Sequence, residues 1–374
     1  MSIAGKCLFP NWRGTSLAVD QPNDSAEHLR EQVLAAVGNK TSLNIVGNSS
    51  KSFYGRQAQG RPLVVSDHNG ILNYEPTELV LTARCGTRLT DIEAVLADQN
   101  QMLAFEPPQF GPNATLGGAI ACGLSGPRRP YNGSVRDAVL GVKLLNGRGE
   151  ILRFGGEVMK NVAGFDVSRL MAGALGTLGV LLEVSIKVSP LPAAELTLVF
   201  EIDATAALKK MNGLSGRNWP LSGACYDGKY LKIRLSGSDS ALAAAKKQLN
   251  GDVQPADEAA LFWLDVREQK LPFFQQEEAA LWRLSLPSSA TKPQFSGSYF
   301  WDWGGALWWL KTHEPAETIF AQAQALGGNA CRFRSAQGGL FQPLSPGLEK
   351  LHKRIKAAFD PHGLFNPGRL YPNL

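Results

Sequence analysis

The stretch that decides the fold is "GPNATLGGAIACGLSGPRRPYNGSVRD", residues 111–137. It carries six glycines and three arginines among small polar side chains. A backbone without bulky side chains can approach a ligand closely, and successive N–H groups on such a loop form a concave nest that binds anions. We therefore expect an anion-binding loop here, with an ordinary surface turn as the alternative.

A second loop has the same character. "VGNSSKSF", residues 46–53, directly follows the β-rich run 42–46. Its glycine, asparagine and serines can donate hydrogen bonds, and Lys51 adds a positive charge. Either loop alone is typical of a surface turn, but the two together favour a site for a diphosphate.

Other phosphate-binding motifs are missing from the sequence. A Rossmann site needs GxGxxG between a strand and a helix, and a P-loop needs GxxxxGK[ST]. "GALGTLG", residues 173–179, has a different spacing and precedes a strand. The sequence therefore does not support a dinucleotide site of the Rossmann type or nucleoside triphosphate chemistry.

Composition bounds the class of protein. A chain of 374 residues favours two domains, and its net charge of +5 without a run of like charges suits a small anionic ligand rather than nucleic acid. The five cysteines are scattered and never form CxxC, which argues against disulfides, zinc and iron–sulfur clusters, so no metal is expected. Reduced thiols and the lack of a signal peptide or an 18-residue apolar run predict a cytoplasmic protein without a transmembrane segment.

The element pattern predicts an α+β protein. Residues 1–24 form an irregular extension, and residues 25–192 form the first domain. We expect a helix capped by Ser25 and ended by Gly38, a helix over 90–99 with a capping box between Thr90 and Glu93, and a hairpin over 138–154. Further strands are expected over 42–46, 63–66, 71–74, 79–86 and 179–188.

Residues 193–339 change character and form a second, smaller domain. Strands and helices alternate there in two similar rounds, which predicts two split βαβ units as in a ferredoxin-like sandwich. The last segment, 340–374, ends in the Pro- and Gly-rich "FDPHGLFNPGRLYPNL" and is expected to return to the first domain.

Four separated motifs carry a family resemblance. "VGNSSKSF", the stretch 111–141, "GEVMKNVAGFDVSRLMAGALGTLGVLLEVSIKV" and "FDPHGLFNPGRLY" follow one another as in the PCMH-type FAD-binding domain of the vanillyl-alcohol-oxidase-like, FAD-linked oxidase superfamily. Together with "LPFF" and "WDWGGALWWLK", the chain resembles, from about residue 27 to its end, the FAD-binding subunits of bacterial glycolate oxidases.

The resemblance implies a two-subdomain FAD-binding domain with a smaller α+β cap. It also implies the residues that surround the cofactor: Val46, Gly47, Asn48, Ser49, Ser50, Lys51, Ser52, Gly111, Ala114, Thr115, Gly117, Gly118, Cys122, Gly123, Ser125, Gly179, Val180 and Asn366. Because the first loop has neither His nor Cys, we expect FAD to be bound noncovalently.

Substrate chemistry is less well defined by the sequence. Relatives that oxidise D-2-hydroxy acids carry a His-rich metal site in the cap, whereas the only histidine in residues 196–335 of this chain is His313. Catalytic residues are therefore unknown; Arg128 and Arg129 are candidates to bind a carboxylate, Tyr131 to transfer a proton and Lys160 to place charge near the flavin. Arg136 is a further candidate to bind the carboxylate, and a structural pair of Arg136 with Asp137 is the alternative.

The predicted cap contains a cluster of four tryptophans. Trp301, Trp303, Trp308 and Trp309 lie within nine residues. Since side chains alternate along a strand, Trp308 and Trp309 should point to opposite faces, with one of the cluster facing a partner subunit, the flavin or solvent.

The resemblance also implies a function and partners. The chain would be the FAD-binding subunit of a complex that oxidises glycolate to glyoxylate, together with a larger FAD-binding subunit and an iron–sulfur subunit. Peripheral attachment to the inner membrane through that complex is left open. The alternatives are a standalone FAD-dependent 2-hydroxy-acid dehydrogenase and a non-redox flavin-binding scaffold.

Overall fold

The structure is a computed structural model, and residues 22–156, 166–275, 279–291 and 295–374 are described. The chain forms two compact units. The pocket unit comprises residues 22–125, 133–190 and 338–374, and the sheet unit comprises residues 126–132 and 191–337. The sequence division placed residues 126–132 in the first domain, whereas in the structure they belong to the sheet unit.

One layer of the pocket unit pairs a helix with two parallel strands. Helix α1 (Ala26–Asn39) packs on β1 (Leu43–Val46) and β2 (Arg61–Val64), with Leu29 and Phe365 fully buried between them. Ser25 is the N-cap residue of this helix, as the sequence predicts, but the predicted capping bond and the predicted glycine at the end are wrong. The hydroxyl of Ser25 does not cap the helix, and Lys40 (φ 52°), not Gly38, takes the left-handed position at its end.

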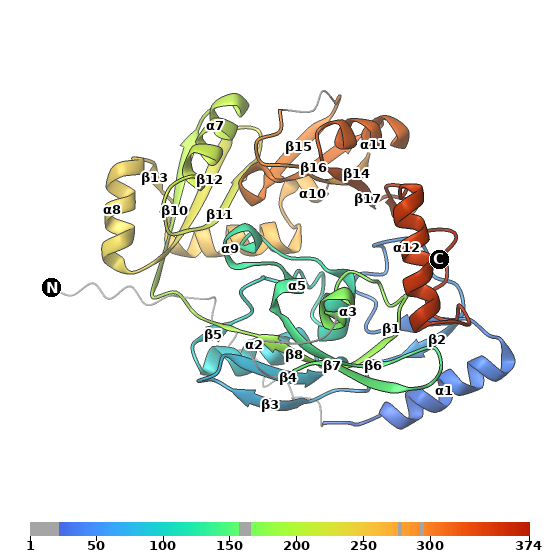
Figure 1. The fold of residues 1–374 in the computed structure, drawn as a ribbon. Helices are drawn as coiled ribbons and strands as arrows, with labels where there is room; N and C mark the ends of the chain where they lie inside the picture. The colour runs from blue at the N-terminus through green and yellow to red at the C-terminus, as the bar shows by residue number, and fades with distance from the viewer. Residues whose placement is uncertain (1–21, 157–165, 276–278, 292–294) are drawn as a thin grey trace. The chain divides into compact units, whose positions relative to one another are not determined.

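The other layer is an antiparallel sheet with the strand order β3-β4-β8-β6-β7. Its central strand is buried on both faces, because it separates two hydrophobic cores. Figure 1 shows this sheet with helices over it. The bounds are β3 (Ile71–Glu75), β4 (Val80–Arg84), β6 (Val139–Leu145), β7 (Ile151–Gly155) and β8 (Val180–Lys187), so the predicted hairpin over 138–154 is confirmed.

Helix α2 (Leu89–Asp98) starts differently from the prediction. Its N-cap is Arg88, and the expected box between Thr90 and Glu93 does not form. The reason is tertiary: the Leu89 N–H donates to the carbonyl of Ala114 at 2.8 Å, so pairing with the glycine-rich stretch sets the first turn. A capping box occurs instead between Ser134 and Asp137 at α5.

Short elements complete the pocket unit. They are β5 (Gln101–Met102), which pairs with β9 (Ser189–Pro190), then α3 (Leu116–Cys122), α5 (Val135–Ala138), α6 (Val167–Leu170), β18 (Leu340–Phe341) and α12 (Pro346–Phe359). Lys356 of α12 holds the C-terminal segment, because its ammonium group donates to the Asp360 carboxylate and to the carbonyls of Thr177 and Phe365.

The sheet unit is built from two similar halves, as the sequence predicts. The first half runs β10-α7-β11-β12-α8-β13 with the strand order β13-β10-β12-β11, the βαββαβ arrangement of a ferredoxin-like fold. Its bounds are β10 (Ala194–Glu201), α7 (Ala204–Ser215), β11 (Leu221–Tyr226), β12 (Tyr230–Gly237), α8 (Asp239–Leu249) and β13 (Asp252–Val253).

The second half has the same strand order, β15-β16-β14-β17, although no helix lies between β14 and β15 in the described residues, and it continues the same sheet through a β11–β15 bridge. Its bounds are β14 (Ala280–Ser285), β15 (Ser298–Asp302), the 3-10 turn η1 (Trp303–Gly305), β16 (Leu307–Thr312), α11 (Ala316–Ala325) and β17 (Asn329–Arg334). Three further helices are α4 (Arg129–Asn132), α9 (Ala256–Glu268) and α10 (Pro272–Gln275).

The tryptophan cluster lies inside the sheet unit. Trp301 and Trp308 share one core, with ring centroids 4.4 Å apart. Trp309 packs instead against Phe274 of α10 and Phe333, so the predicted alternation is confirmed. The expectation that one of these rings faces a partner, the flavin or solvent is wrong, because each of the four tryptophans is at most 7% exposed.

Within the described ranges, no helix is long and apolar enough to cross a membrane. The same part of the chain contains no group of three or more His, Cys, Asp or Glu side chains arranged to hold a metal ion.

Candidate functional site

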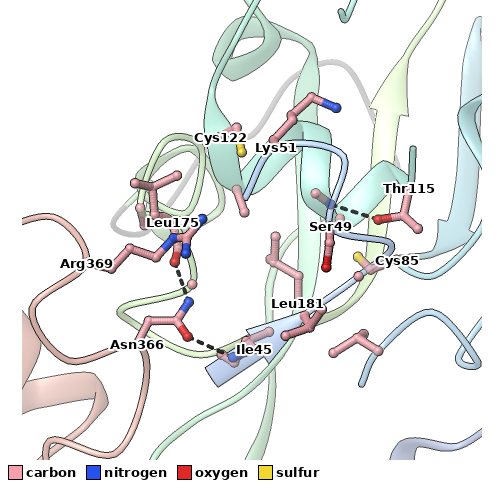
Figure 2. A pocket seen from close by; sticks show the side chains of 18 of the residues that line it. Ile45, Ser49, Lys51, Cys85, Thr115, Cys122, Leu175, Leu181, Asn366 and Arg369 are labelled. Carbon is pink, nitrogen blue, oxygen red and sulfur yellow. Dashed lines mark hydrogen bonds between the residues drawn. The ribbon is translucent and has the colours of Figure 1, made fainter. Parts of the chain in front are cut away.

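A pocket opens in the pocket unit where β1 ends (Figure 2). Four segments meet there: the loop after β1, helix α3, residues 171–181 and the C-terminal segment. Most of the predicted cofactor residues line it: Val46, Gly47, Asn48, Ser49, Ser50, Lys51, Ser52, Thr115, Gly117, Gly118, Cys122, Gly179 and Asn366. Motifs separated by up to about three hundred residues are thus brought into one cavity.

The other five predicted residues do not line this pocket. Gly111, Ala114, Gly123, Ser125 and Val180 are not among its lining residues. Gly123 ends α3 in the left-handed conformation, and the Ser125 hydroxyl accepts a hydrogen bond from the Val135 N–H at 2.9 Å.

The loop after β1 offers backbone donors to a ligand. Across the described residues, no acceptor is bonded to the N–H groups of Gly47, Asn48, Ser49 or Ser50. Ser49 has a φ of 58°, so the backbone turns there into the left-handed region. Successive unpaired N–H groups at such a turn form an anion nest, and the loop therefore suits a phosphate group.

Part of the second expected nest is already hydrogen-bonded within the protein. Three N–H groups at the start of α3 donate hydrogen bonds within the protein. The Leu116 N–H donates to the Thr87 carbonyl, the Gly117 N–H to the Cys85 carbonyl, and the Gly118 N–H to the Thr115 hydroxyl. A Cβ on Gly117 would lie 2.7 Å from the Cβ of Cys85. Gly117 thus allows close packing against Cys85, and the N–H groups of the first turn of α3 are engaged within the protein.

At Gly47 the loop after β1 comes close to Thr115, the residue before α3. A Cβ at this position would lie 2.7 Å from the Thr115 hydroxyl oxygen, so a larger residue would push the loop away from α3. The need for glycine here is steric, since the loop must touch Thr115 to close one side of the pocket.

Asn366 ties three lining segments together. Its side chain is buried, its Oδ1 accepts from the Ile45 N–H at 2.7 Å, and its Nδ2 donates to the Leu175 carbonyl at 2.6 Å (Figure 2). The side-chain amide is therefore engaged with the protein backbone. Asn366 lines the pocket as predicted, but its hydrogen bonds position the walls.

Two cations belong to the pocket lining, Lys51 and Arg369. The Lys51 ammonium donates to the carbonyl of Gln109 at 3.2 Å, and the Arg369 guanidinium donates to the carbonyl of Tyr54 at 3.2 Å. Burial lowers the pKa of Arg369, yet a guanidinium stays protonated in proteins. Arg369 was missed from the sequence, although it stands three residues after Asn366 in the same motif.

The remaining wall is apolar and also went unpredicted. Its side chains suit a flat aromatic ring system: Ile45, Val65, Met171, Leu175, Leu178 and Leu181. Cys85 and Cys122 line the pocket as well, and burial raises the pKa of both thiols. Protonated thiols are poor nucleophiles, so neither is prepared to form a covalent bond to a ligand.

The candidate catalytic residues are not gathered at this pocket. Arg128 is 3% exposed and forms an ion pair with Glu195 and a hydrogen bond with Ser236 in the sheet unit, so its assignment to a substrate is corrected. Arg129 lies against the Trp303 ring. Burial raises the pKa of Tyr131, which makes it a poor proton donor, and Lys160 lies outside the described residues.

Arg136 is exposed, and the Asp137 carboxylate accepts from the backbone N–H and hydroxyl of Ser134. The Asp137 carboxylate therefore belongs to the capping box at the start of α5.

Comparisons with known proteins agree with this architecture. Residues 17–155 match the FAD binding domain family. A solved structure of alkyldihydroxyacetonephosphate synthase has a TM-score of 0.63 over 91% of this chain and 75% of that one, and at 16% identity it indicates a shared fold.

Two curated relatives are closer in sequence. The glycolate oxidase subunit GlcD of Bacillus subtilis is 34% identical over 220 residues, which is 55% of this chain and 45% of that protein. The glycolate oxidase subunit GlcE of Escherichia coli K12 is 49% identical over 351 residues, which is 94% of this chain and 99% of that protein. The chain therefore belongs to the family of the glycolate oxidase subunit GlcE, among the FAD-linked oxidoreductases.

Proposed function

We propose that this chain binds FAD noncovalently in the described pocket and serves as an FAD-carrying subunit of a glycolate-oxidising complex. The observation that carries this proposal is the row of N–H groups at Gly47–Ser50 that have no acceptor among the described residues, in the same pocket lining as Lys51 and Arg369. A diphosphate carries two negative charges and many acceptor oxygens, and this combination of donors and cations matches both properties.

The pocket residues divide by chemistry. Gly47–Ser50 and the two cations would hold the diphosphate, and the apolar wall would hold a planar ring and exclude water from it. Asn366 would keep β1, residue 175 and the C-terminal segment in register around the cofactor. Bound FAD supplies the acceptor for the two electrons that leave C2 of a 2-hydroxy acid when it becomes a 2-oxo acid.

The complex is part of the proposal. We infer that a larger FAD-binding subunit and an iron–sulfur subunit complete the complex, and that electrons leave this chain through these partners. The names of the GlcE and GlcD relatives support an enzyme of several subunits. The chain would then act on glycolate together with these partners rather than alone.

A comparison of the isolated chain with the assembled complex tests this proposal. The chain is purified alone and with the two partner subunits, and glycolate is added without oxygen while the visible flavin absorption is followed. We expect bound flavin in both preparations, with bleaching and glyoxylate formation in the complex. A chain that binds no flavin in either preparation would contradict the cofactor assignment, and bleaching of the isolated chain would instead make it a standalone dehydrogenase.

A further inference from the structure

The segment 106–111 contacts the loop after β1 and has a strained backbone. Glu106 and Phe110 have φ values of 46° and 53°, and such angles are unfavourable for residues with bulky side chains. The φ of Phe110 orients the peptide plane that carries the Gln109 carbonyl, because that plane directly precedes the rotated bond. Strain of this kind persists only where neighbouring contacts hold it, and it is frequent at ligand sites.

The Gln109 carbonyl holds the ammonium group of Lys51. The Lys51 Nζ donates to this carbonyl at 3.2 Å and to the Ser50 hydroxyl at 3.4 Å, and it lies 5.8 Å from the centroid of the Phe110 ring. Lys51 is 6% exposed and belongs to the pocket lining. A carbonyl oxygen has no net charge, so this hydrogen bond fixes the position of the ammonium group without neutralising it.

The side chain of Gln109 ties the segment to helix α2. Gln109 is buried, and its Nε2 donates to the Glu93 carboxylate at 2.8 Å. A hydrogen bond to a charged acceptor is stronger than one between neutral groups. The Phe53 ring, from the loop after β1, packs edge-on against Phe110 with ring centroids 5.5 Å apart. Two contacts therefore hold the strained segment on either side of the Gln109 carbonyl.

We propose that Gln109 is a positioning residue for FAD: its side chain, anchored at Glu93, places the carbonyl that keeps the Lys51 ammonium group in the pocket wall. This role rests on the proposed function. Gln109 is not among the lining residues, so its effect on FAD passes through Lys51. A lysine side chain is flexible, and holding it in place beforehand lowers the entropy lost when the diphosphate binds. Loss of the anchor should therefore weaken the binding of the diphosphate rather than that of the flavin ring.

Calorimetric titration of the full-length chain, freed of flavin, with FAD and with riboflavin tests this role. We expect Gln109→Leu to weaken FAD binding about tenfold, because a charge-assisted contact with the diphosphate becomes less well ordered. Riboflavin lacks the diphosphate, so its affinity should change by less than about twofold. Lys51→Met should also weaken FAD binding, and adding Gln109→Leu to it should cause little further loss.

Two further variants complete the comparison. Glu93→Gln keeps an acceptor for the Gln109 amide and should bind FAD within about threefold of the unaltered chain, since a neutral hydrogen bond replaces a charged one. Gln99→Leu removes an exposed glutamine at the end of α2 and should leave both affinities unchanged. If Gln109→Leu does not fold, Glu93→Leu removes the anchor from its other side and gives the same comparison.

Three results would overturn the role of Gln109. Equal losses of FAD and riboflavin affinity in Gln109→Leu would indicate a general disturbance of the pocket. Losses from Gln109→Leu and Lys51→Met that add in the double variant would show that Gln109 acts independently of Lys51. An unchanged FAD affinity in Gln109→Leu would remove the role while the proposed function stands, whereas an unaltered chain that binds no FAD would contradict the proposed function itself.

Discussion

Replacing Asn366 by aspartate should destabilise the pocket unit by about 3 kcal/mol at neutral pH and release FAD from the purified chain. The Asn366 amide donates to the Leu175 carbonyl at 2.6 Å, and its side chain is buried. A carboxylate would place an oxygen against that carbonyl oxygen and leave the carbonyl without a donor. Because Ile45 and Leu175 both line the pocket, the disturbance reaches the cofactor site directly.

The pH dependence of this variant's stability distinguishes the loss of the hydrogen bond to Leu175 from a general loss of packing. Burial raises the pKa of the introduced carboxyl group, and its protonated form can again donate to Leu175. The stability deficit should therefore be complete above that raised pKa and shrink as the pH falls from about 8 to about 5. Urea unfolding at several pH values measures this deficit.

Asn218→Asp is the matched control, because Asn218 is exposed. It should stay within about 0.5 kcal/mol of the unaltered chain. A deficit in Asn366→Asp that does not change with pH would argue against the hydrogen bond to Leu175 as its cause.

Replacing Arg369 by glutamine should weaken FAD binding by about 10- to 100-fold. The guanidinium belongs to the pocket lining, and no carboxylate in the described residues forms an ion pair with it. A hydrogen bond between charged groups contributes about 1.5–3 kcal/mol, which corresponds to that loss of affinity. Quenching of FAD fluorescence by the stripped chain gives the dissociation constant.

Two variants accompany this experiment. Arg369→Lys keeps the charge and should recover part of the affinity. Arg148→Gln removes an exposed arginine of the same unit and should bind FAD like the unaltered chain. An unchanged FAD affinity in Arg369→Gln would show that this cation does not contact the diphosphate.

The sequence predicts the fold well where local patterns and long motifs agree. The hairpin over 138–154 and the two ferredoxin-like halves follow from alternating strands and helices, and tertiary contacts leave that order intact. Helix caps are less predictable. The start of α2 depends on a hydrogen bond to the Ala114 carbonyl, which is distant in sequence. The capping box that the local Thr90–Glu93 pattern predicts therefore does not form.

The candidate site was predicted in part. The order of the motifs identifies the loop 46–52 and Asn366, but it does not show which backbone N–H groups are already hydrogen-bonded within the protein. The head of α3 has the same glycine-rich character as the loop after β1, yet its donors are satisfied by Thr87, Cys85 and Thr115. The hydrogen bonds in the three-dimensional structure are needed to tell which backbone N–H groups are engaged within the protein and which have no acceptor among the described residues.

The arginines of the opening stretch illustrate the same limit. Sequence alone gives Arg128 and Arg129 equal standing as carboxylate ligands. The structure matches Arg128 to Glu195 and places Arg129 beside Trp303 and Arg283, a residue that stands about 150 positions away and belongs to no motif. Partner residues that come from distant strands have no sequence pattern to reveal them.

The central claim is that the loop Gly47–Ser50, with Lys51 and Arg369, holds the diphosphate of FAD. Calorimetric titration of the stripped chain with FAD and with riboflavin, which has the flavin ring but no diphosphate, tests it most directly. We predict saturable, stoichiometric binding of FAD that is about 100-fold or more tighter than binding of riboflavin, since several charge-assisted hydrogen bonds are lost with the diphosphate. Equal affinities for the two ligands, or no binding of FAD, would contradict the account.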